Sequence, residues 1–155
     1  MIKISRLTDY AVLVLLELDS KARNLSAAQI SRQTSIPVPT VAKVAKILNQ
    51  SGLIESKRGA EGGYNLSTDI EDISVGHVIE IFDGPLALTS CVGAGDDSCA
   101  LEASCAMAGK WASLNNQIRH LLYNTSLRDM IAQPKGPSNL SAPAGYNQRE
   151  ESVRS

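Results

Sequence analysis

Several features are missing from this sequence of 155 residues, and each absence excludes a class of protein. The longest apolar run, from Tyr10 to Leu16, ends at Glu17 and is far too short to span a bilayer. The N-terminus enters an amphipathic pattern directly, without the small-residue cleavage site of a signal peptide. No nucleophile–base set, paired carboxylates or cofactor loop is present, so we do not expect an enzyme. The composition therefore predicts a globular, non-enzymatic protein of the cytoplasm, with no membrane partner and no small-molecule substrate.

Cysteine is scarce, and the three cysteines occupy one short segment rich in Gly, Asp and Ser. They are Cys91, Cys99 and Cys105, with seven residues between the first pair and five between the second. An odd number without a secretion signal indicates a reducing compartment, where thiolates remain available to metals. No pair has Cys-x-x-Cys spacing, which argues against zinc ribbons and thioredoxin-like motifs. Three thiolates are one short of a four-ligand site, so the segment predicts a labile iron–sulfur centre completed by a non-cysteine ligand.

Global basicity is also missing, because the net charge is −1. Charge must therefore be considered locally. Residues 1–70 carry nine Lys and Arg against six Asp and Glu, and the remainder of the chain carries the balancing negative charge. Any nucleic-acid contact is expected within this first part of the chain.

The first half of the chain has the pattern of a helix-turn-helix. Residues 6–20 form a helix that is apolar around much of its girth, and a capping box at residues 26–29 opens a second helix. A short connection leads to a third helix, with Pro39 suited to its first position and Gly52 just past its end. Spacing predicts that its core-facing residues are Val41, Val44, Ala45 and Leu48, and that its outer residues are Thr40, Lys43, Lys46 and Gln50. The alternative is an ordinary helix pair with a solvated charged face.

The next segment favours the DNA-binding interpretation. Residues 53–57 and 64–66 are expected to be short strands, joined by the Gly-rich sequence from Arg58 to Tyr64. A hairpin directly after a recognition helix is the wing of a winged helix, and Arg58 at its base is placed to contact a phosphate or a narrow minor groove. Nucleotide binding is excluded, because no Gly-Lys-Ser/Thr and no helix follow the glycines.

The second half combines a capped helix, the cysteine segment and an apolar helical seam. Ser74 begins a helix that Gly84 and Pro85 end. The seam, with spacing 4, 3, 4, 3, consists of Met107, Trp111, Leu114, Ile118 and Leu121, and is typical of helix packing between subunits. A short helix over 126–131 follows, and the Pro/Gly/Ser/Asn-rich remainder is predicted to be disordered. We therefore expect a mostly α fold with a small β-hairpin, divided into a winged helix-turn-helix domain (1–83), a cysteine loop (84–105), dimerisation helices (106–132) and a tail (133–155).

Over residues 1–132 the sequence resembles the winged-helix iron–sulfur transcription regulators typified by the IscR and NsrR proteins. The resemblance is carried by Leu7-Thr-Asp-Tyr-Ala11, by the wing segment 58–64 and by the three cysteines before a long helix. Among the subgroups the sequence is most similar to regulators of the SUF iron–sulfur assembly operon. The shared features are residues 36–41, residues 84–91, Trp111, Ile118 and Arg119.

The resemblance implies a homodimer whose third helices enter the major groove of double-stranded operator DNA. By position, the implied contacts to bases or phosphates from the turn and third helix are Ser35, Thr40, Lys43 and Lys46. Arg58 and Tyr64 are the implied wing contacts. Phosphate contacts usually outnumber base contacts, so only two or three of these residues need to recognise bases.

The resemblance also implies a cluster held by Cys91, Cys99 and Cys105, with a 2Fe–2S centre preferred over 4Fe–4S. IscR-type members supply a histidine three residues after the last cysteine, but that position here is Ala108, which cannot ligate. NsrR-type members use an acidic residue of the partner's first helix, and Asp9 matches that position. Asp9 also suits a helix N-terminus, where an acid is favourable. Alternatives within the loop are Asp96, Asp97 and Glu102, whereas His77 and His120 are expected to be solvated or packing residues.

The function that follows is a DNA-binding regulator, a repressor by family resemblance, whose operator affinity depends on its cluster and whose targets are SUF assembly genes. One alternative is an iron–sulfur electron carrier, although a carrier would have four cysteines and little reason for a winged helix. A second alternative keeps DNA binding but senses through thiol oxidation or zinc. Which of the cluster-bound and cluster-free forms binds DNA remains open from the residues.

Overall fold

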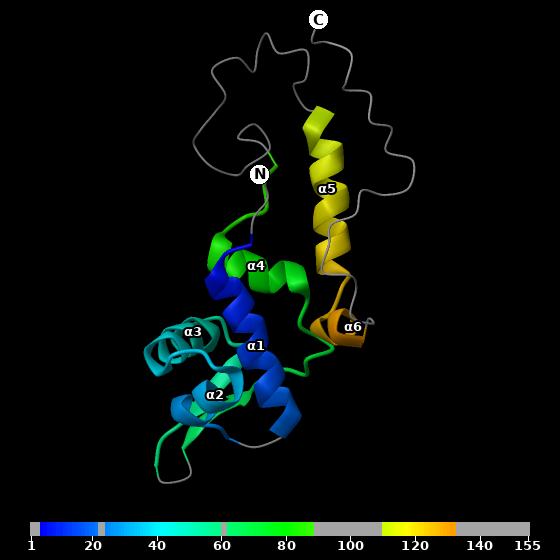
Figure 1. The fold of residues 1–155 in the computed structure, drawn as a ribbon. Coiled ribbons are helices and arrows are strands. Elements are labelled where there is room, and N and C mark those ends of the chain that lie inside the picture. The colour runs from blue at the N-terminus through cyan, green and yellow to red at the C-terminus, as the bar shows by residue number, and fades with distance from the viewer. Residues whose placement is uncertain (1–3, 22–23, 60–61, 89–109, 133–155) are drawn as a thin grey trace, which may run out of the picture.

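The computed structural model describes residues 4–21, 24–59, 62–88 and 110–132 (Figure 1). The cysteine segment, Ala108, Met107 and the C-terminal tail lie outside the described residues. The structure does not test their roles, which remain predictions.

The N-terminal unit is a helix-turn-helix packed on a long first helix. Helix α1 spans Arg6–Lys21, α2 spans Ala27–Thr34 and α3 spans Val38–Gln50 (Figure 1). The predicted capping box is confirmed, because the Ser26 side chain accepts from the Gln29 N–H while the Gln29 side chain accepts from the Ser26 N–H. Helix α3 begins one residue before Pro39, and Gly52 lies past its end with φ of 79°. This φ is in the left-handed region, which explains a glycine there.

The hydrophobic core forms where α1, α2, α3 and α4 (Val75–Asp83) meet. The predicted core face of α3 is confirmed, because Val41, Val44, Ala45 and Leu48 are fully buried. On α1 the buried side chains recur at the spacing of one helical face, and they are Ala11, Val14, Leu15 and Leu18. Burial of each Val or Leu side chain in this core stabilises the fold by about 1.5–3 kcal/mol relative to exposure.

The two short strands form the predicted hairpin. Strand β1 (Ile54–Lys57) pairs antiparallel with β2 (Gly63–Leu66), with Ile54 opposite Leu66 and Lys57 opposite Gly63. The segment before α2 joins the hairpin, since Leu25 and Tyr64 exchange two backbone hydrogen bonds of 3.0 and 2.8 Å. The winged helix-turn-helix class is thereby confirmed in these elements.

The C-terminal helices return to the N-terminal unit. Helix α5 (Lys110–Tyr123) extends beyond α4, and α6 (Leu127–Ala132) packs near the C-terminal end of α1 (Figure 1). Leu127 is fully buried and belongs to the same core as the winged helix. Backbone hydrogen bonds from Leu127 to Ile73 and from Val75 to Thr125 join the two segments. The C-terminal end of α5 is therefore attached to the DNA-binding unit.

Candidate nucleic-acid interface and cysteine segment

The outer face of α3 carries unpaired cations. Lys43 and Lys46 are exposed and lie opposite the buried face, while Thr40 is half-buried near the first turn. Among the described residues, neither lysine forms an ion pair. Ammonium groups without a carboxylate partner remain available to phosphates. This face has the geometry required of a recognition helix.

The turn before α3 holds the candidate Ser35 in a restricted backbone conformation. Ser35 is exposed, has φ of 61° and donates its N–H to the Ser31 carbonyl at 2.8 Å. Non-glycine residues rarely adopt this region, and one that does usually occupies a tightly determined turn. Ile36, 3% exposed, follows directly and anchors the turn in the core. The serine side chain is thus presented close to the N-terminus of α3.

The shape of the wing depends on Gly62 and Gly63, because neither position has space for a side chain. A Cβ on Gly62 would lie 2.5 Å from the Lys57 carbonyl oxygen, and one on Gly63 would lie 2.6 Å from the Leu25 carbonyl carbon. Exposed Arg58 has no ion-pair partner among the residues that the structure describes, whereas Lys57 pairs with Glu55 at 3.5 Å. Arg58 is therefore the wing cation better placed for a phosphate.

Tyr64, the second wing candidate, is half-buried and packs against the hydrophobic core. Its backbone also pairs with Leu25. These contacts assign the residue a packing role, and DNA contact by its phenol remains a prediction.

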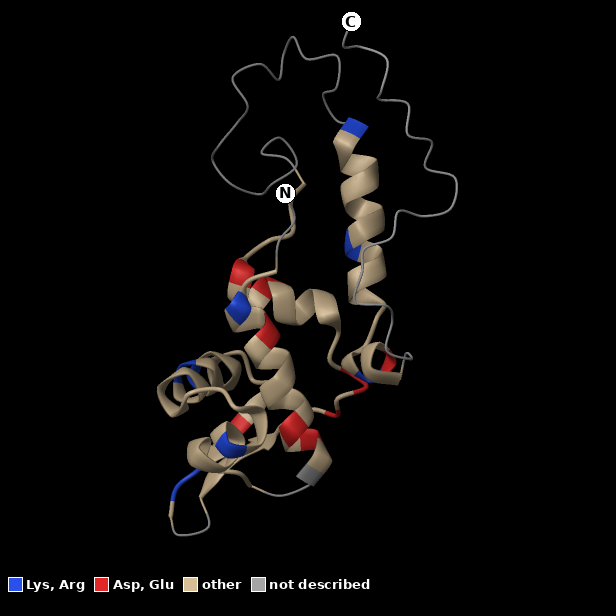
Figure 2. Cartoon of the chain, viewed as in Figure 1, with Lys and Arg blue, Asp and Glu red and all other residues tan. Residues whose placement is uncertain are grey.

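Several cationic residues lie on the helix-turn-helix and the hairpin. Figure 2 shows Lys and Arg on α2, α3 and the hairpin, whereas carboxylates recur along α1 and the loop before α4. Between residues 27 and 66 the sequence has five basic residues against two acidic ones. The sequence predicted a local basic excess, and the fold concentrates it on the helix-turn-helix and wing. Exposed Arg32, on the last turn of α2, belongs to this surface and was absent from the sequence-based candidates.

Asp9, the predicted fourth ligand, is an exposed side chain in the first turn of α1. Within the described part of the chain its carboxylate has no hydrogen-bond or ion-pair partner. A hard oxygen donor that is neither buried nor paired among the described residues is available to bind a metal ion. The structure therefore leaves the ligand role open to Asp9.

The residues beside Asp9 join α1 to the end of α4. The Asp83 carboxylate accepts from the Ser5 N–H at 3.0 Å and from the Thr8 hydroxyl at 2.9 Å, and Thr8 is only 2% exposed. Partial burial raises the pKa of Asp83, but the hydrogen bonds from Ser5 and Thr8 outweigh it and leave the pKa below the ordinary value of 3.8. Asp83 precedes the cysteine loop, so this loop starts beside the N-terminus of α1.

Asn115 of α5 holds the residues that enter the cysteine segment. Its Oδ1 accepts from the Leu88 N–H at 3.0 Å, and its Nδ2 donates to the Leu86 carbonyl at 3.3 Å. The side chain is 4% exposed. Sequence reasoning did not single out Asn115, because Asn116 and Gln117 lie in the same interval between Leu114 and Ile118 and are both exposed.

The first turn of α4 packs closely against the C-terminal end of α5. A Cβ on buried Gly76 would lie 2.9 Å from the Tyr123 ring, so the glycine allows the helices to approach. Glu80 pairs with Arg119 at 3.0 Å and accepts a hydrogen bond from the Tyr123 hydroxyl. Partial burial and this hydrogen bond raise the pKa of Tyr123.

The apolar seam predicted on α5 is largely uncovered in the single chain. Trp111, Leu114 and Leu121 are 38%, 43% and 67% exposed, while Ile118 is half-buried. Large apolar side chains aligned along one helix indicate an interaction surface.

The residues present fit an iron–sulfur group by their chemistry. Three thiols within one segment supply soft ligands, and the unpaired carboxylate of Asp9 supplies an oxygen donor. Within the described ranges, no three His, Cys, Asp or Glu side chains are grouped so as to hold a metal ion. His77 and His120 are exposed on α4 and α5. The cysteines are thus the only thiol donors that the sequence offers to such a group.

The fold and the cationic α3 face define a winged helix-turn-helix DNA-binding protein. The model of the Rrf2 family, described as "Iron-dependent Transcriptional regulator", matches residues 4–133. The chain belongs to the Rrf2 family and is a DNA-binding transcriptional regulator. This confirms the family resemblance inferred from the sequence, whereas the similarity to SUF regulators remains a prediction.

The chain is 32% identical over 124 residues to the HTH-type transcriptional regulator IscR of Vibrio campbellii, covering 79% of this chain and 73% of that one. Among solved structures it is similar to CymR, the global cysteine regulator of B. subtilis. That match has a TM-score of 0.64 and 25% identity and covers 85% and 98% of the two chains. T. potens IscR shares the fold, with a TM-score of 0.62 and 23% identity. That match covers 87% of this chain and 94% of the other. The relatives named here as regulators agree with the expectation that the protein is not an enzyme.

The part of the chain described by the structure contains no helix that combines the length and the apolar character needed to cross a membrane.

Proposed function

We propose that this protein is a homodimeric repressor whose operator affinity is gated by an iron–sulfur cluster. The observation that supports the DNA contact is the cationic face of α3: Lys43 and Lys46 are exposed, as is the wing residue Arg58, and none of the three forms an ion pair among the described residues. Ser35 and Thr40 flank the start of this helix and are the candidates for base contact. Tyr64 packs against the hydrophobic core and thereby holds the wing in place.

The dimer is supported by the exposed seam of α5. Trp111, Leu114 and Leu121 would be buried against a second copy, and a two-fold related pair would present two recognition helices to successive major grooves. In this arrangement Met107 extends the seam by one position. The loop 84–105 holds the cluster, residues 106–132 carry the dimer contact, and the tail over 133–155 has no assigned role.

The cluster is supported by the three thiols and by the iron-dependent description of the family. Cys91, Cys99 and Cys105 hold it, and Asp9 of the partner subunit supplies the fourth ligand. A 2Fe–2S centre is preferred. When bound, the group supplies a redox-active and labile centre, because one oxygen donor binds iron less firmly than a fourth thiolate. Its state shifts the equilibrium between dimers that can and cannot bind DNA.

The proposed targets are genes of SUF iron–sulfur assembly. This assignment comes from the subgroup resemblance in residues 36–41 and 84–91. A regulator that monitors cluster supply through its own labile cluster would suit such an operon.

The decisive experiment is a mobility-shift titration with the promoter upstream of the protein's own gene. It compares anaerobically purified protein, the same sample after chelation, and Asp9→Ala, with Asp72→Ala as an exposed carboxylate control. We expect the loaded and chelated forms to differ in affinity, Asp9→Ala to behave like the chelated form, and Asp72→Ala to behave like the wild type. Equal binding by the loaded and chelated forms would reject cluster gating.

The same samples separate the alternatives. Iron and acid-labile sulfide in the purified protein distinguish a cluster from zinc or plain thiols. Operator binding distinguishes a regulator from an iron–sulfur electron carrier.

A further inference from the structure

The exposed face of α3 is apolar at its start and cationic one turn later. At about 100° per residue, the exposed positions of this helix fall within an arc of about 140°. From the first turn to the last they are Val38, Pro39, Ala42, Lys43, Lys46, Asn49 and Gln50. The opposite arc carries the four side chains that are fully buried in the core. One face therefore presents an apolar surface next to the two lysines that are available to phosphates.

Val38 is the largest side chain of this apolar surface. It is 44% exposed, and among the described residues of α2, α3 and the hairpin it is the only large apolar side chain exposed to this degree. It is the first residue of α3, and the N-terminal residues of a recognition helix are the ones that contact base edges. Val38 therefore faces away from the core, on the side where the bases lie in the proposed complex.

The first turn of α3 has few groups that could recognise bases through hydrogen bonds. Pro37 and Pro39 have no backbone N–H, and the Thr40 N–H donates to the Pro37 carbonyl at 2.9 Å. Bidentate recognition of guanine or adenine requires Arg, Lys, Asn or Gln, and residues 36–42 contain none of these. The hydroxyls of Ser35 and Thr40 can each donate or accept, so they discriminate poorly between bases. Discrimination at this end of the helix is left to apolar contact.

Thymine is the base that offers a matching apolar group, because its C5-methyl group projects into the major groove. We propose that Val38, with Ala42 one turn later, contacts the methyl group of a thymine in each operator half-site and thereby helps to determine the operator sequence. This inference rests on the proposed function, because it assumes that α3 enters the major groove. Lys43 and Lys46 hold the helix on phosphates of any sequence, whereas Val38 selects among sequences.

The test compares operators that contain thymine with operators that contain uracil, which forms the same base pair and lacks only the methyl group. Footprinting locates the operator in the promoter upstream of the protein's own gene, and synthetic duplexes then carry uracil at every thymine or at one thymine at a time. These duplexes contain no 5-methylcytosine, so thymine is the one source of the methyl group.

Fluorescence anisotropy measures the affinity of the full-length wild type, Val38→Ala, Val38→Thr and Leu13→Ala for each duplex. Leu13, 39% exposed on α1, is the matched apolar control. Circular dichroism checks that the variants keep the wild-type helix content.

We expect the wild type to lose affinity about fourfold for each half-site in which the contacted thymine is replaced, as for one buried methyl group. Val38→Ala should bind the thymine operator more weakly than the wild type and should lose nothing further from uracil at that position. Val38→Thr keeps one methyl group in the same shape and should retain part of the preference. Leu13→Ala should show the wild-type ratio of the two affinities.

Equal affinity of the wild type for the thymine and uracil operators would overturn the proposal. A preference for thymine that persists unchanged in Val38→Ala would overturn it too, because the methyl group would then act through DNA shape or another residue. All titrations use whichever of the loaded and chelated forms binds more tightly, so equal binding by the two forms would reject cluster gating without affecting the thymine test. Failure of both forms to bind the operator specifically would reject the proposed function and this inference together.

Discussion

Gly63 illustrates how one residue without a side chain determines the wing. Its φ is 151°, and the space beside its Cα is filled by the Leu25 backbone, which pairs with Tyr64. The glycine is required both by its conformation and by the approach of a neighbouring segment.

Gly63→Ala should lower the free energy of unfolding by about 2 kcal/mol or more, because a Cβ would lie within 2.6 Å of the Leu25 backbone. Gly52→Ala is the matched control, since Gly52 has φ of 79° but nothing within 4 Å of its Cβ position. That control should lose only about 1 kcal/mol. Chemical denaturation measures both, and equal losses would contradict the steric argument.

Asp83 makes part of the stability dependent on pH. Its folded-state pKa lies below 3.8, because hydrogen bonds from Ser5 and Thr8 favour the carboxylate despite partial burial. A depressed acid pKa contributes stability that is fully present above the unfolded value and is lost as pH falls through the folded value.

Asp83→Asn should remove this contribution. Thermal unfolding between about pH 5 and pH 2.5 should therefore show a steeper loss of stability in the wild type than in the variant. Asp72→Asn, at an exposed position, should retain the wild-type slope. Parallel curves for the wild type and Asp83→Asn would exclude the Asp83 linkage.

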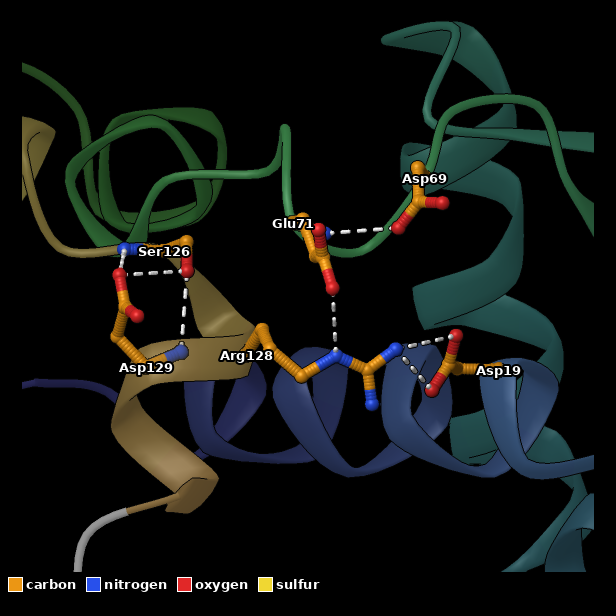
Figure 3. Close-up of polar contacts among 6 residues, drawn as sticks. All are labelled: Asp19, Asp69, Glu71, Ser126, Arg128 and Asp129. Carbon is orange, nitrogen blue, oxygen red and sulfur yellow. Dashed lines mark hydrogen bonds and ion pairs between the residues drawn. The ribbon is translucent and has the colours of Figure 1, made fainter.

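At the scale of elements, α6 is attached to the DNA-binding unit by a branched ion pair. Arg128 lies between two carboxylates, with N–O distances of 3.2 Å to Asp19 of α1 and 3.5 Å to Glu71 before α4 (Figure 3). The Ser126 hydroxyl accepts from the Asp129 N–H at 3.0 Å and caps the same helix. These contacts attach α6, and through it the C-terminal end of α5, to the winged helix.

Arg128→Ala should lower the free energy of unfolding by about 1 kcal/mol, and the loss should shrink at high salt because the guanidinium is partly exposed. Lys57→Ala breaks the more exposed pair with Glu55 and should cost less. Denaturation at low and high ionic strength tests both. An Arg128→Ala loss that does not depend on salt would point to lost packing in place of lost charge.

The recognition helix and wing make a separate prediction about DNA. Lys43→Ala, Lys46→Ala and Arg58→Ala should each reduce the slope of log affinity against log salt by about 1, as expected for one lost phosphate contact. Lys57→Ala should change the slope less, because Glu55 already pairs with that lysine. Fluorescence anisotropy over a salt series measures the slopes. An unchanged slope would indicate that the substituted residue does not bind a phosphate.

At the scale of the whole molecule, the position of α5 would set the spacing of the recognition helices in the proposed dimer. One end of α5 is fixed by Gly76, Glu80 and α6, while its seam remains open to a second copy. A helix attached to the DNA-binding unit and exposed along an apolar face can transmit a change in dimer packing to α3.

Leu114→Glu should yield a folded monomer, because Leu114 is 43% exposed and contributes little to the core of the single chain. Operator affinity should fall at least tenfold, since two half-sites would no longer be bound together. Gln117→Glu adds the same charge at another exposed position of α5 and should remain dimeric. Sedimentation and mobility shift test the pair, and a dimeric Leu114→Glu would reject the seam as the interface.

Much of the fold could be predicted from the sequence, because its determinants are local. The capping box at Ser26, the buried stripe from Val41 to Leu48, the glycine after α3 and the hairpin all depend on residues a few positions apart. Helical and strand periodicities encode such features directly. The family resemblance depended on the same short segments and was confirmed.

The candidate site was predictable only in its chemistry. The sequence identified the thiols, the carboxylate of Asp9 and the cations of α3 as candidate groups, and it correctly placed an apolar seam on α5. It did not identify Asn115 or Asp83, because their partners lie 27 to 78 residues away along the chain. Hydrogen bonds between distant segments leave no periodic pattern in a sequence.

The sequence by itself therefore determined the class of fold, the boundaries of α1, α3, α4 and α6 to within a residue or two, and the inventory of groups that can bind DNA or iron. Only the tertiary structure decided that the α3 lysines have no ion-pair partner among the described residues, which seam residues are exposed, and how residues 84–88 are held between α1 and α5. The physical reason is that periodicity specifies which face of an element is buried. Packing alone specifies which other element covers that face and which buried polar groups then find partners.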